Sequence, residues 1–171
     1  DAISTTDGLT TADNRRSFDR RLSHECALAV EQKSRLTLVL VDMNGLKRIN
    51  DTWGHAVGDA AIQKLAEVVR RFIRSSDIFA RLGGDEFALI LPETGTRGAL
   101  SLVGRIHKEL DIERLSIPRI PDLEITATCG IAELDPETGE PTAAQLGSAR
   151  RLRTIFDANM RVSYAAGHWA N

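Results

Sequence analysis

Residues 77–91, Asp77-Ile-Phe-Ala-Arg-Leu-Gly-Gly-Asp-Glu-Phe-Ala-Leu-Ile-Leu91, contain two apolar runs on either side of a glycine pair. A two-residue turn between paired strands needs positive φ angles, which glycine adopts without steric cost. The stretch therefore predicts a β-hairpin that turns at Gly83 and Gly84. Asp85 and Glu86 follow, and the period of two along a strand predicts one carboxylate on each face. Acids beside bare glycines are typical of a metal and phosphate site, although a solvent-exposed hairpin has the same pattern.

Another carboxylate follows the apolar run Leu36-Thr-Leu-Val-Leu-Val41. A short continuous run rich in β-favouring residues predicts a strand that is buried on both faces, and this one ends at Asp42. If the two predicted strands are neighbours, Asp42 and the acids of the hairpin converge and can hold one or two divalent cations. We expect the side-chain oxygens of Asp42 and Asp85 to lie within roughly 5 Å of each other, about one ion's coordination diameter.

The rest of the chain alternates helical and strand patterns. Apolar residues at helical spacing predict helices over residues 13–32, from residue 59 to about 73, after residues 94–96 and, more weakly, from residue 142 to the end. We expect polar residues 10–14 to cap the first helix and Thr94 or Thr96 to cap the third. Residues 44–58 predict a short helix followed by a loop, residues 118–121 a connector, and residues 123–134 a strand that Gly130 could interrupt. This order predicts one α/β or α+β domain.

Composition limits the classes of function. With 171 residues, 42% of them hydrophobic, the chain can bury one sizeable core. A net charge of −2 gives no broad cationic surface and argues against binding of duplex nucleic acid, while a small anion needs only local positive charge. Cys26 and Cys129 lack a paired spacing and predict reduced, packed thiols of a cytoplasmic domain. Without a signal peptide or a run of about 18 apolar residues, we expect no direct membrane contact by this segment, although a parent protein could be membrane-tethered.

Three residues near the acidic positions have two interpretations each. Lys47 is either a point charge for phosphate or a solvated surface lysine. Asp59 is either a helix N-cap or a base-reading residue, because a carboxylate can accept hydrogen bonds from guanine N1–H and N2–H₂. His55 lies between glycines, a pattern that favours loop packing over a role as catalytic base.

Arginines surround the first strand of the hairpin. Arg74-Ser-Ser-Asp77 precedes it, and Arg81 lies four residues beyond Asp77. Spacing alone favours a local salt bridge between Arg74 and Asp77. The alternative is an arginine cluster that binds guanine edges or phosphates bidentately.

Together, four ordered motifs resemble the GGDEF-domain family of diguanylate cyclases. Residues 7–16, Asp-Gly-Leu-Thr-Thr-Ala-Asp-Asn-Arg-Arg, are similar to the family's entry pattern D-x-L-T-x-L-x-N-R-R. Residues 41–51, Val-Asp-Met-Asn-Gly-Leu-Lys-Arg-Ile-Asn-Asp, resemble its D-x-D-x-F-K-x-x-N-D segment. Trp53-Gly-His-Ala-Val-Gly-Asp59 is similar to G-H-x-x-G-D, and residues 83–87 match the signature that names the family. Four motifs at the family's spacing are a much stronger signal than one pentapeptide.

The resemblance implies a palm-like fold similar to that of nucleotidyl cyclases, with a mostly antiparallel sheet of about five strands flanked by helices. It implies condensation of two GTP molecules into cyclic di-GMP with release of two pyrophosphates, and Mg²⁺ or Mn²⁺ as cofactor. Each domain would bind one GTP, so catalysis would need a second copy. Residues 1–171 would then be one catalytic domain of a longer signalling protein, with residues 1–6 left from the linker to an upstream module.

Carried over residue by residue, the resemblance makes Asp42, Asp85 and Glu86 catalytic. The metal ligands would be these same carboxylates and the backbone carbonyl of Met43. The resemblance also implies that Asn50 and Asp59 read guanine and that Lys47, Gly83 and Gly84 bind phosphate. It implies an R-x-x-D product-inhibition site formed by Arg74, Asp77 and Arg81. This last assignment replaces the local preference for a salt bridge.

The sequence also departs from the family pattern. Asn44 replaces the second Asp of D-x-D, and Leu46 replaces its Phe. Near the C-terminus, Tyr164 and His168 stand where the family has Lys and Arg. Loss of both cations would remove charge-assisted hydrogen bonds to the triphosphate, each worth about 1.5–3 kcal/mol. The alternative function is therefore a catalytically impaired domain that acts as a cyclic di-GMP receptor. A dimerisation module that binds no nucleotide fits poorly with so many retained site residues.

Overall fold

The computed structural model describes residues 4–139, in which helices and strands alternate. The elements are α1 (Arg15–Gln32), β1 (Leu36–Met43), α2 (Leu46–Trp53), α3 (His55–Phe72), β2 (Ile78–Gly83), β3 (Glu86–Pro92), α4 (Thr96–Ile112), β4 (Leu115–Ile117), β5 (Ile120–Leu123) and β6 (Ala127–Leu134). The helical region predicted from residue 142 onward, with Tyr164 and His168, lies outside the described residues. No helix within residues 4–139 is both long and apolar enough to cross a membrane.

The main sheet is antiparallel at every pairing. Its strands lie in the order β2-β3-β1-β6, so β1 is central. The prediction of a mixed α/β fold with an antiparallel sheet flanked by helices is confirmed, with four strands in the sheet of the described residues instead of about five. In β6, Gly130 pairs with Leu40 and does not interrupt the strand, which begins later than predicted, at Ala127.

β4 and β5 form a separate two-stranded ribbon where the sequence predicted only a connector. Pro118 and Arg119 make the turn between them. Proline presets a negative φ at the first turn position, and Arg119 takes a φ of 67° at the second. The short strands can therefore pair although Pro118 lies between them.

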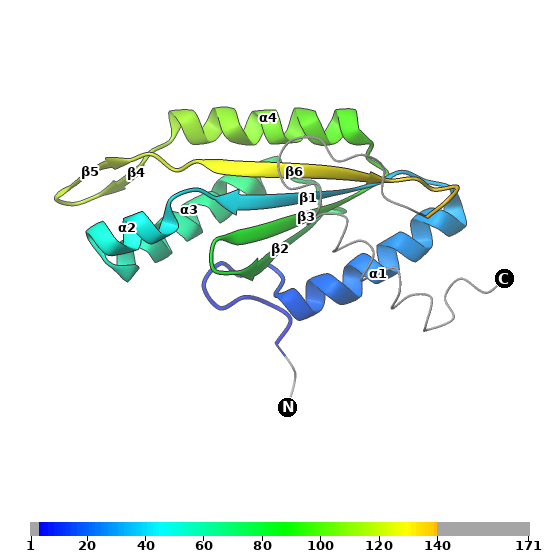
Figure 1. Ribbon diagram of the computed structural model, residues 1–171, viewed down its shortest axis with the longest axis horizontal. Helices are drawn as coiled ribbons and strands as arrows, with labels where there is room; N and C mark the ends of the chain where they lie inside the picture. The colour runs from blue at the N-terminus through cyan, green and yellow to red at the C-terminus, as the bar shows by residue number, and fades with distance from the viewer. Residues whose placement is uncertain (1–3, 140–171) are drawn as a thin grey trace.

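Both faces of β1 are buried, as the continuous apolar run predicted. Val39 and Val41 belong to the core cluster that contains the apolar residues of α3 and α4. Leu38 and Leu40 belong to the second cluster, which contains those of α1. Figure 1 shows α1 and α4 on opposite sides of the sheet. The alternation along β1 thus sorts its side chains between two helical layers.

Polar side chains cap two of the helices, one locally and one from a distant strand. Asn14 caps α1 as expected, since its Oδ1 accepts the Ser17 N–H at 2.9 Å. α4 begins after Gly95 without a side-chain cap from that residue, so the prediction of a threonine cap is wrong. Instead Glu133 of β6 accepts hydrogen bonds from the backbone N–H and the hydroxyl of Thr96, each at 2.7 Å. A carboxylate at this helix end also complements the helix dipole.

The segment before α1 is attached to the edge of the sheet at β2. The Asp13 N–H donates to the Phe79 carbonyl at 3.0 Å, and the Arg81 N–H donates to the Asp13 carbonyl at 2.8 Å. Asp7 accepts hydrogen bonds from the Thr10 N–H and hydroxyl, each at 2.8 Å, and pairs with Arg81 at 3.2 Å. Burial alone would raise the pKa of Asp7, but these hydrogen bonds and the guanidinium outweigh it, so the pKa lies below 3.8.

We predict that Asp7→Asn lowers the free energy of unfolding at pH 7 by about 1–3 kcal/mol, because it removes a charge from a mostly buried hydrogen-bonded group. A lowered folded-state pKa stabilises the protein above the unfolded-state pKa of about 3.9, and the contribution is lost as pH falls through the folded value. The difference in stability between the two proteins should therefore begin to shrink below about pH 4 and disappear below the folded-state pKa of Asp7. Urea unfolding monitored by circular dichroism at pH 7 and pH 3 measures both effects. Equal stability at pH 7 would contradict the prediction.

Candidate metal and nucleotide site

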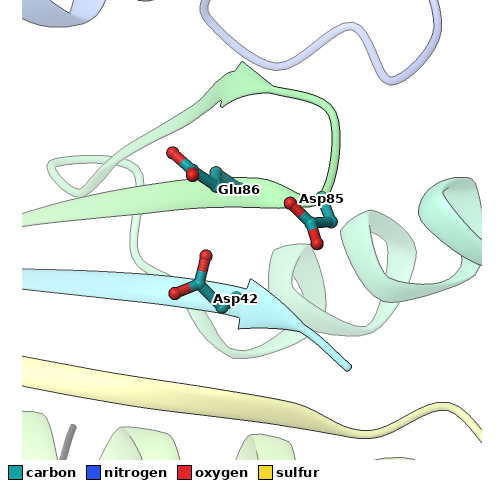
Figure 2. Close-up of side chains that lie close together, drawn as sticks. All are labelled: Asp42, Asp85 and Glu86. Carbon is teal, nitrogen blue, oxygen red and sulfur yellow. The ribbon is translucent and has the colours of Figure 1, made fainter. Parts of the chain in front are cut away.

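The register of the sheet brings two carboxylates together at one end of β1. Asp42 lies directly opposite Glu86 of β3, and directly opposed residues of an antiparallel pair point to the same face. That face is covered by α1, because Leu40 and Ala88 belong to the α1 cluster. Asp85 approaches from the turn, and one side-chain oxygen from each of the three acids lies within 4.8 Å of the other two (Figure 2). The predicted convergence of Asp42 and Asp85 is confirmed.

The turn between β2 and β3 differs by one residue from the predicted turn. Gly83 pairs with Glu86, and the turn residues are Gly84 and Asp85. Asp85 therefore lies in the turn and not on the outgoing strand, because a register shift between Arg81 and Gly83 takes up one residue of β2. The φ angles of 142° at Gly83 and 48° at Gly84 favour glycine, and a Cβ at either position would meet no atom of residues 4–139 within 4 Å beyond its chain neighbours. The backbone of the turn is open to a ligand.

Hydrogen bonds hold this turn from two sides. The Met43 N–H donates to the Asp85 carbonyl at 2.9 Å, which ties the turn to the end of β1. The Arg81 guanidinium donates to the Gly84 carbonyl through Nη2 at 2.8 Å and Nε at 3.2 Å. The same guanidinium pairs with Asp7, so the N-terminal segment is linked to the turn through one side chain. These bonds keep the carboxylate of Asp85 close to β1.

The three acids have the chemistry of a divalent cation site. Carboxylate oxygens are the ligands that Mg²⁺ prefers in proteins. Like charges this close repel one another, and a cation between them would remove that repulsion. All three side chains are partly exposed, so an ion and a phosphate have access to them. Ligation by the Met43 carbonyl stays a prediction.

A buried thiol belongs to Cys129 of β6, which pairs with Val41, the residue before Asp42. Burial, with a smaller contribution from the nearby Asp42 carboxylate, raises the pKa of Cys129 to about 12. Burial similarly raises the pKa of Cys26 to about 12. Both cysteines are free and buried, which confirms that they are packed thiols. A thiol with so high a pKa stays protonated near neutral pH, whereas the thiolate is the form that binds metal. The candidate metal ligands are therefore the carboxylate oxygens and not the Cys129 sulfur.

Asn44, which departs from the family pattern, has a structural role. Its amide Nδ2 donates to the Thr126 hydroxyl at 3.2 Å, and its Oδ1 accepts the Thr128 hydroxyl at 3.0 Å. Its backbone N–H donates to the Thr126 carbonyl at 2.9 Å. Asn44 therefore links the end of β1 to the start of β6.

The residues predicted to read guanine come from two consecutive helices. α3 begins at His55, after Gly54 with a φ of 92° and no side-chain cap. Asp59 is therefore an exposed residue inside the helix, and its N-cap interpretation is wrong. His55 is also exposed, so the loop-packing interpretation is wrong for it. Asn50 of α2 lies against Gly58, the residue next to Asp59 on α3.

Lys47 lies in the first turn of α2, where it is exposed and forms no ion pair with another described residue. It is thus available to a phosphate, and that role stays a prediction. A cavity of about 660 Å³ on α2 is lined by residues that include Arg48, Trp53 and Glu124. Its lining contains none of the residues predicted to bind nucleotide.

The arginine motif is divided between two places. Arg74 and Asp77 form the local salt bridge at 3.1 Å, and the Arg74 N–H donates to the same carboxylate at 2.8 Å. They line a cavity of about 340 Å³ that Arg105 of α4 also lines. Arg81 is not in this lining, because it lies four residues further along β2, roughly 13 Å at the strand rise, and is bound to Asp7. The structure therefore brings Arg105, and not Arg81, to Arg74 and Asp77.

Arg105 is the residue that the sequence analysis missed. Its guanidinium lies 5.7 Å from the ring centre of Phe72, at the end of α3. Contact between α3 and α4 creates this neighbourhood, so no spacing within one motif could have indicated it. The only signal was an arginine beside the buried helical stripe that contains Leu102 and Ile106.

Known proteins match both this fold and these motifs. The family model described as "Diguanylate cyclase, GGDEF domain" matches residues 4–154. Probable diguanylate cyclase DgcC of Escherichia coli K12 is 38% identical over 135 residues, which cover 79% of this chain and 36% of that protein. Diguanylate cyclase TpbB of Pseudomonas aeruginosa UCBPP-PA14 is 38% identical over 148 residues, covering 84% of this chain and 33% of that protein. The chain spans about a third of the length of these relatives.

A solved structure extends the match to the fold. The GGDEF domain of DgcB from Caulobacter crescentus, in complex with c-di-GMP, has a TM-score of 0.77 and 31% identity. The alignment covers 98% of this chain and 91% of that one. With the family model matching most of its length and the signature acids assembled at one turn, the chain belongs to the GGDEF-domain family of diguanylate cyclases.

Proposed function

We propose that this chain is the catalytic domain of a diguanylate cyclase, which condenses two GTP molecules into cyclic di-GMP and releases two pyrophosphates. One observation carries the proposal: Asp42, Asp85 and Glu86 converge within 4.8 Å at the turn that bears the family signature. The names of the relatives, diguanylate cyclases from two bacteria, support the same activity.

The proposed chemistry forms two phosphodiester bonds. In each, the 3′-oxygen of one GTP bonds to the α-phosphorus of the other, and the bond from that phosphorus to pyrophosphate breaks. Asp85 accepts the proton of the attacking hydroxyl. Asp42, Asp85 and Glu86, with the Met43 carbonyl, would hold Mg²⁺ or Mn²⁺, which when bound stabilises negative charge on the phosphate oxygens. In-line positioning supplies much of the remaining catalysis.

Other residues of the chain would bind the rest of the nucleotide. The open backbone at Gly83 and Gly84 lets N–H groups approach phosphate oxygens. Lys47 adds a positive charge that no other described residue neutralises. Asn50 and Asp59 offer an amide and a carboxylate to the guanine edge. Each domain holds one GTP in this scheme, so a second copy must supply the other.

We also propose that cyclic di-GMP inhibits the domain from the cavity lined by Arg74, Asp77 and Arg105. Two guanidinium groups at one cavity can bind the O6 and N7 edge of guanine bidentately, or a phosphate. Asp77 orients Arg74 through their salt bridge, and the side chain of Asp77 is only 4% exposed. The cavity is lined by residues of β3 and α4, and β3 begins directly after the acidic turn.

A dimerised protein tests the proposed activity directly. We expect a fusion of the chain to a dimeric coiled coil, incubated with GTP and Mg²⁺, to produce cyclic di-GMP and two pyrophosphates for each product molecule, measured by chromatography. A folded, dimeric fusion that makes no product with Mg²⁺ or Mn²⁺ would overturn it. Binding of cyclic di-GMP without turnover would instead support the receptor function, for which Tyr164 and His168 in place of two family cations are the sequence argument.

Asp85→Ala should abolish metal-dependent GTP turnover without unfolding the domain, because it removes both a metal ligand and the proposed proton acceptor. We expect a loss of at least about 10²-fold in kcat, the lower range for a general base. Asp111→Ala is the matched control, since Asp111 is exposed on α4 and forms no ion pair with other described residues. Unchanged cyclic di-GMP output from Asp85→Ala would remove the proposed role.

Arg105→Ala should weaken binding of cyclic di-GMP by about 10–150-fold, the effect of losing one charge-assisted hydrogen bond. Isothermal titration calorimetry measures the affinity, and the rate of GTP turnover at rising product concentration measures the loss of inhibition. Lys108→Ala removes the same charge from the exposed surface of α4 but does not line the cavity. Equal affinities for both variants would show that product binds elsewhere.

A further inference from the structure

Gly58 of α3 allows an unusually close contact with α2. A Cβ added at position 58 would lie 1.8 Å from Oδ1 and 2.9 Å from Cγ of Asn50, and 3.3 Å from Cδ1 of Leu46. Distances below 3.0 Å essentially never occur for a real Cβ. The Asn50 amide therefore occupies the space where any other residue at position 58 would place its side chain.

The backbone at position 58 gives no other reason for glycine. Gly58 is buried inside α3 and is not among the glycines with a positive φ. Alanine would favour the helix over glycine by about 1 kcal/mol on intrinsic propensity. Gly104 of α4 is a useful comparison, because a Cβ there would meet no atom of another described residue within 4 Å. The contact with α2 distinguishes Gly58 from Gly104.

The Asn50 amide is held by this packing and not by hydrogen bonds. Its side chain is half-buried and makes no hydrogen bond to any residue within 4–139. Its backbone carbonyl accepts the Gly54 N–H at 2.9 Å, which fixes the end of α2. The amide thus has a free donor and a free acceptor within the described part of the chain, directly beside the backbone that carries Asp59.

We infer that Gly58 is a positioning residue for base recognition: its missing side chain lets the Asn50 amide lie against α3 next to Asp59. The inference rests on the proposed function, in which Asn50 and Asp59 read guanine. A methyl group at position 58 forces the Asn50 amide to rotate out of this space. Because the asparagine side chain is short, its amide cannot avoid the methyl group and still lie next to Asp59. The substitution does not distort α3, so Asp59 keeps its proposed contacts with guanine.

The test is a double-mutant cycle on binding of a GTP analogue with a methylene group between the α- and β-phosphates, which cannot release pyrophosphate. We expect Gly58→Ala and Asn50→Ala each to weaken binding by roughly 3–10-fold, the effect of one neutral hydrogen bond. Gly58→Ala should have no further effect in the Asn50→Ala background, because the displaced amide is already absent. Gly104→Ala is the control and should bind like the unmodified chain. Independent, additive effects of the two substitutions would overturn the inference.

Two further measurements separate the possible failures. Thermal unfolding should show that Gly58→Ala raises the Tm in the Asn50→Ala background but not in the unmodified chain, and a rise in both would overturn the inference. The corresponding ATP analogue tests the proposed function itself. If the unmodified chain binds the GTP and ATP analogues equally, guanine reading fails as a whole. If it prefers the GTP analogue and the cycle is additive, only the role of Gly58 fails.

Discussion

The antiparallel pairing of β1 with β3 is the constraint on which the rest of this structure depends. Side chains alternate along both strands, so the register decides which residues face α1 and which face α3 and α4. A slip of one residue would move Asp42 to the side of the larger core cluster and take Val41 out of it. In the observed register, alternate apolar residues of β1 fill both clusters, and Asp42 lies among the acids at the turn. The packing of the core and the assembly of the acidic cluster therefore depend on the same register.

The acidic site also strains that arrangement, since it gathers negative charge at the end of the sheet. The turn is held against this repulsion by the Met43 bond to the Asp85 carbonyl and by the Arg81 bonds to the Gly84 carbonyl. Arg81 brings a positive charge close to the turn while its partner Asp7 belongs to the segment before α1. The same guanidinium thus offsets the repulsion and connects the N-terminal segment to the site.

Elements defined by local pattern could be predicted from the sequence, and contacts between distant elements could not. The run before Asp42 and the glycine pair before Asp85 were sufficient to predict two strands, and they predicted a shared site on the condition that these strands are neighbours. The start of α3 was missed because the glycines around His55 resemble a loop, although one of them, Gly54, precedes a helix. Glu133 caps α4 from a strand much later in the chain, and Arg105 reaches the cavity at Arg74 only through the packing of α4. Glu133 carries no local signal of its role, and the only local signal of Arg105 is its position beside the buried stripe of α4.

Asn44 shows why a departure from a family pattern needs the structure to be interpreted. Read from the sequence, it removes a negative charge beside the metal site. In the structure its amide donates to Thr126 and accepts from Thr128, and a carboxylate at this position could only accept. An aspartate would therefore have to rely on the Thr126 hydroxyl as a donor to keep both contacts. Because Asp42, Asp85 and Glu86 converge without a carboxylate at position 44, the acidic cluster is complete there, and the Asn44 amide links β1 to the start of β6.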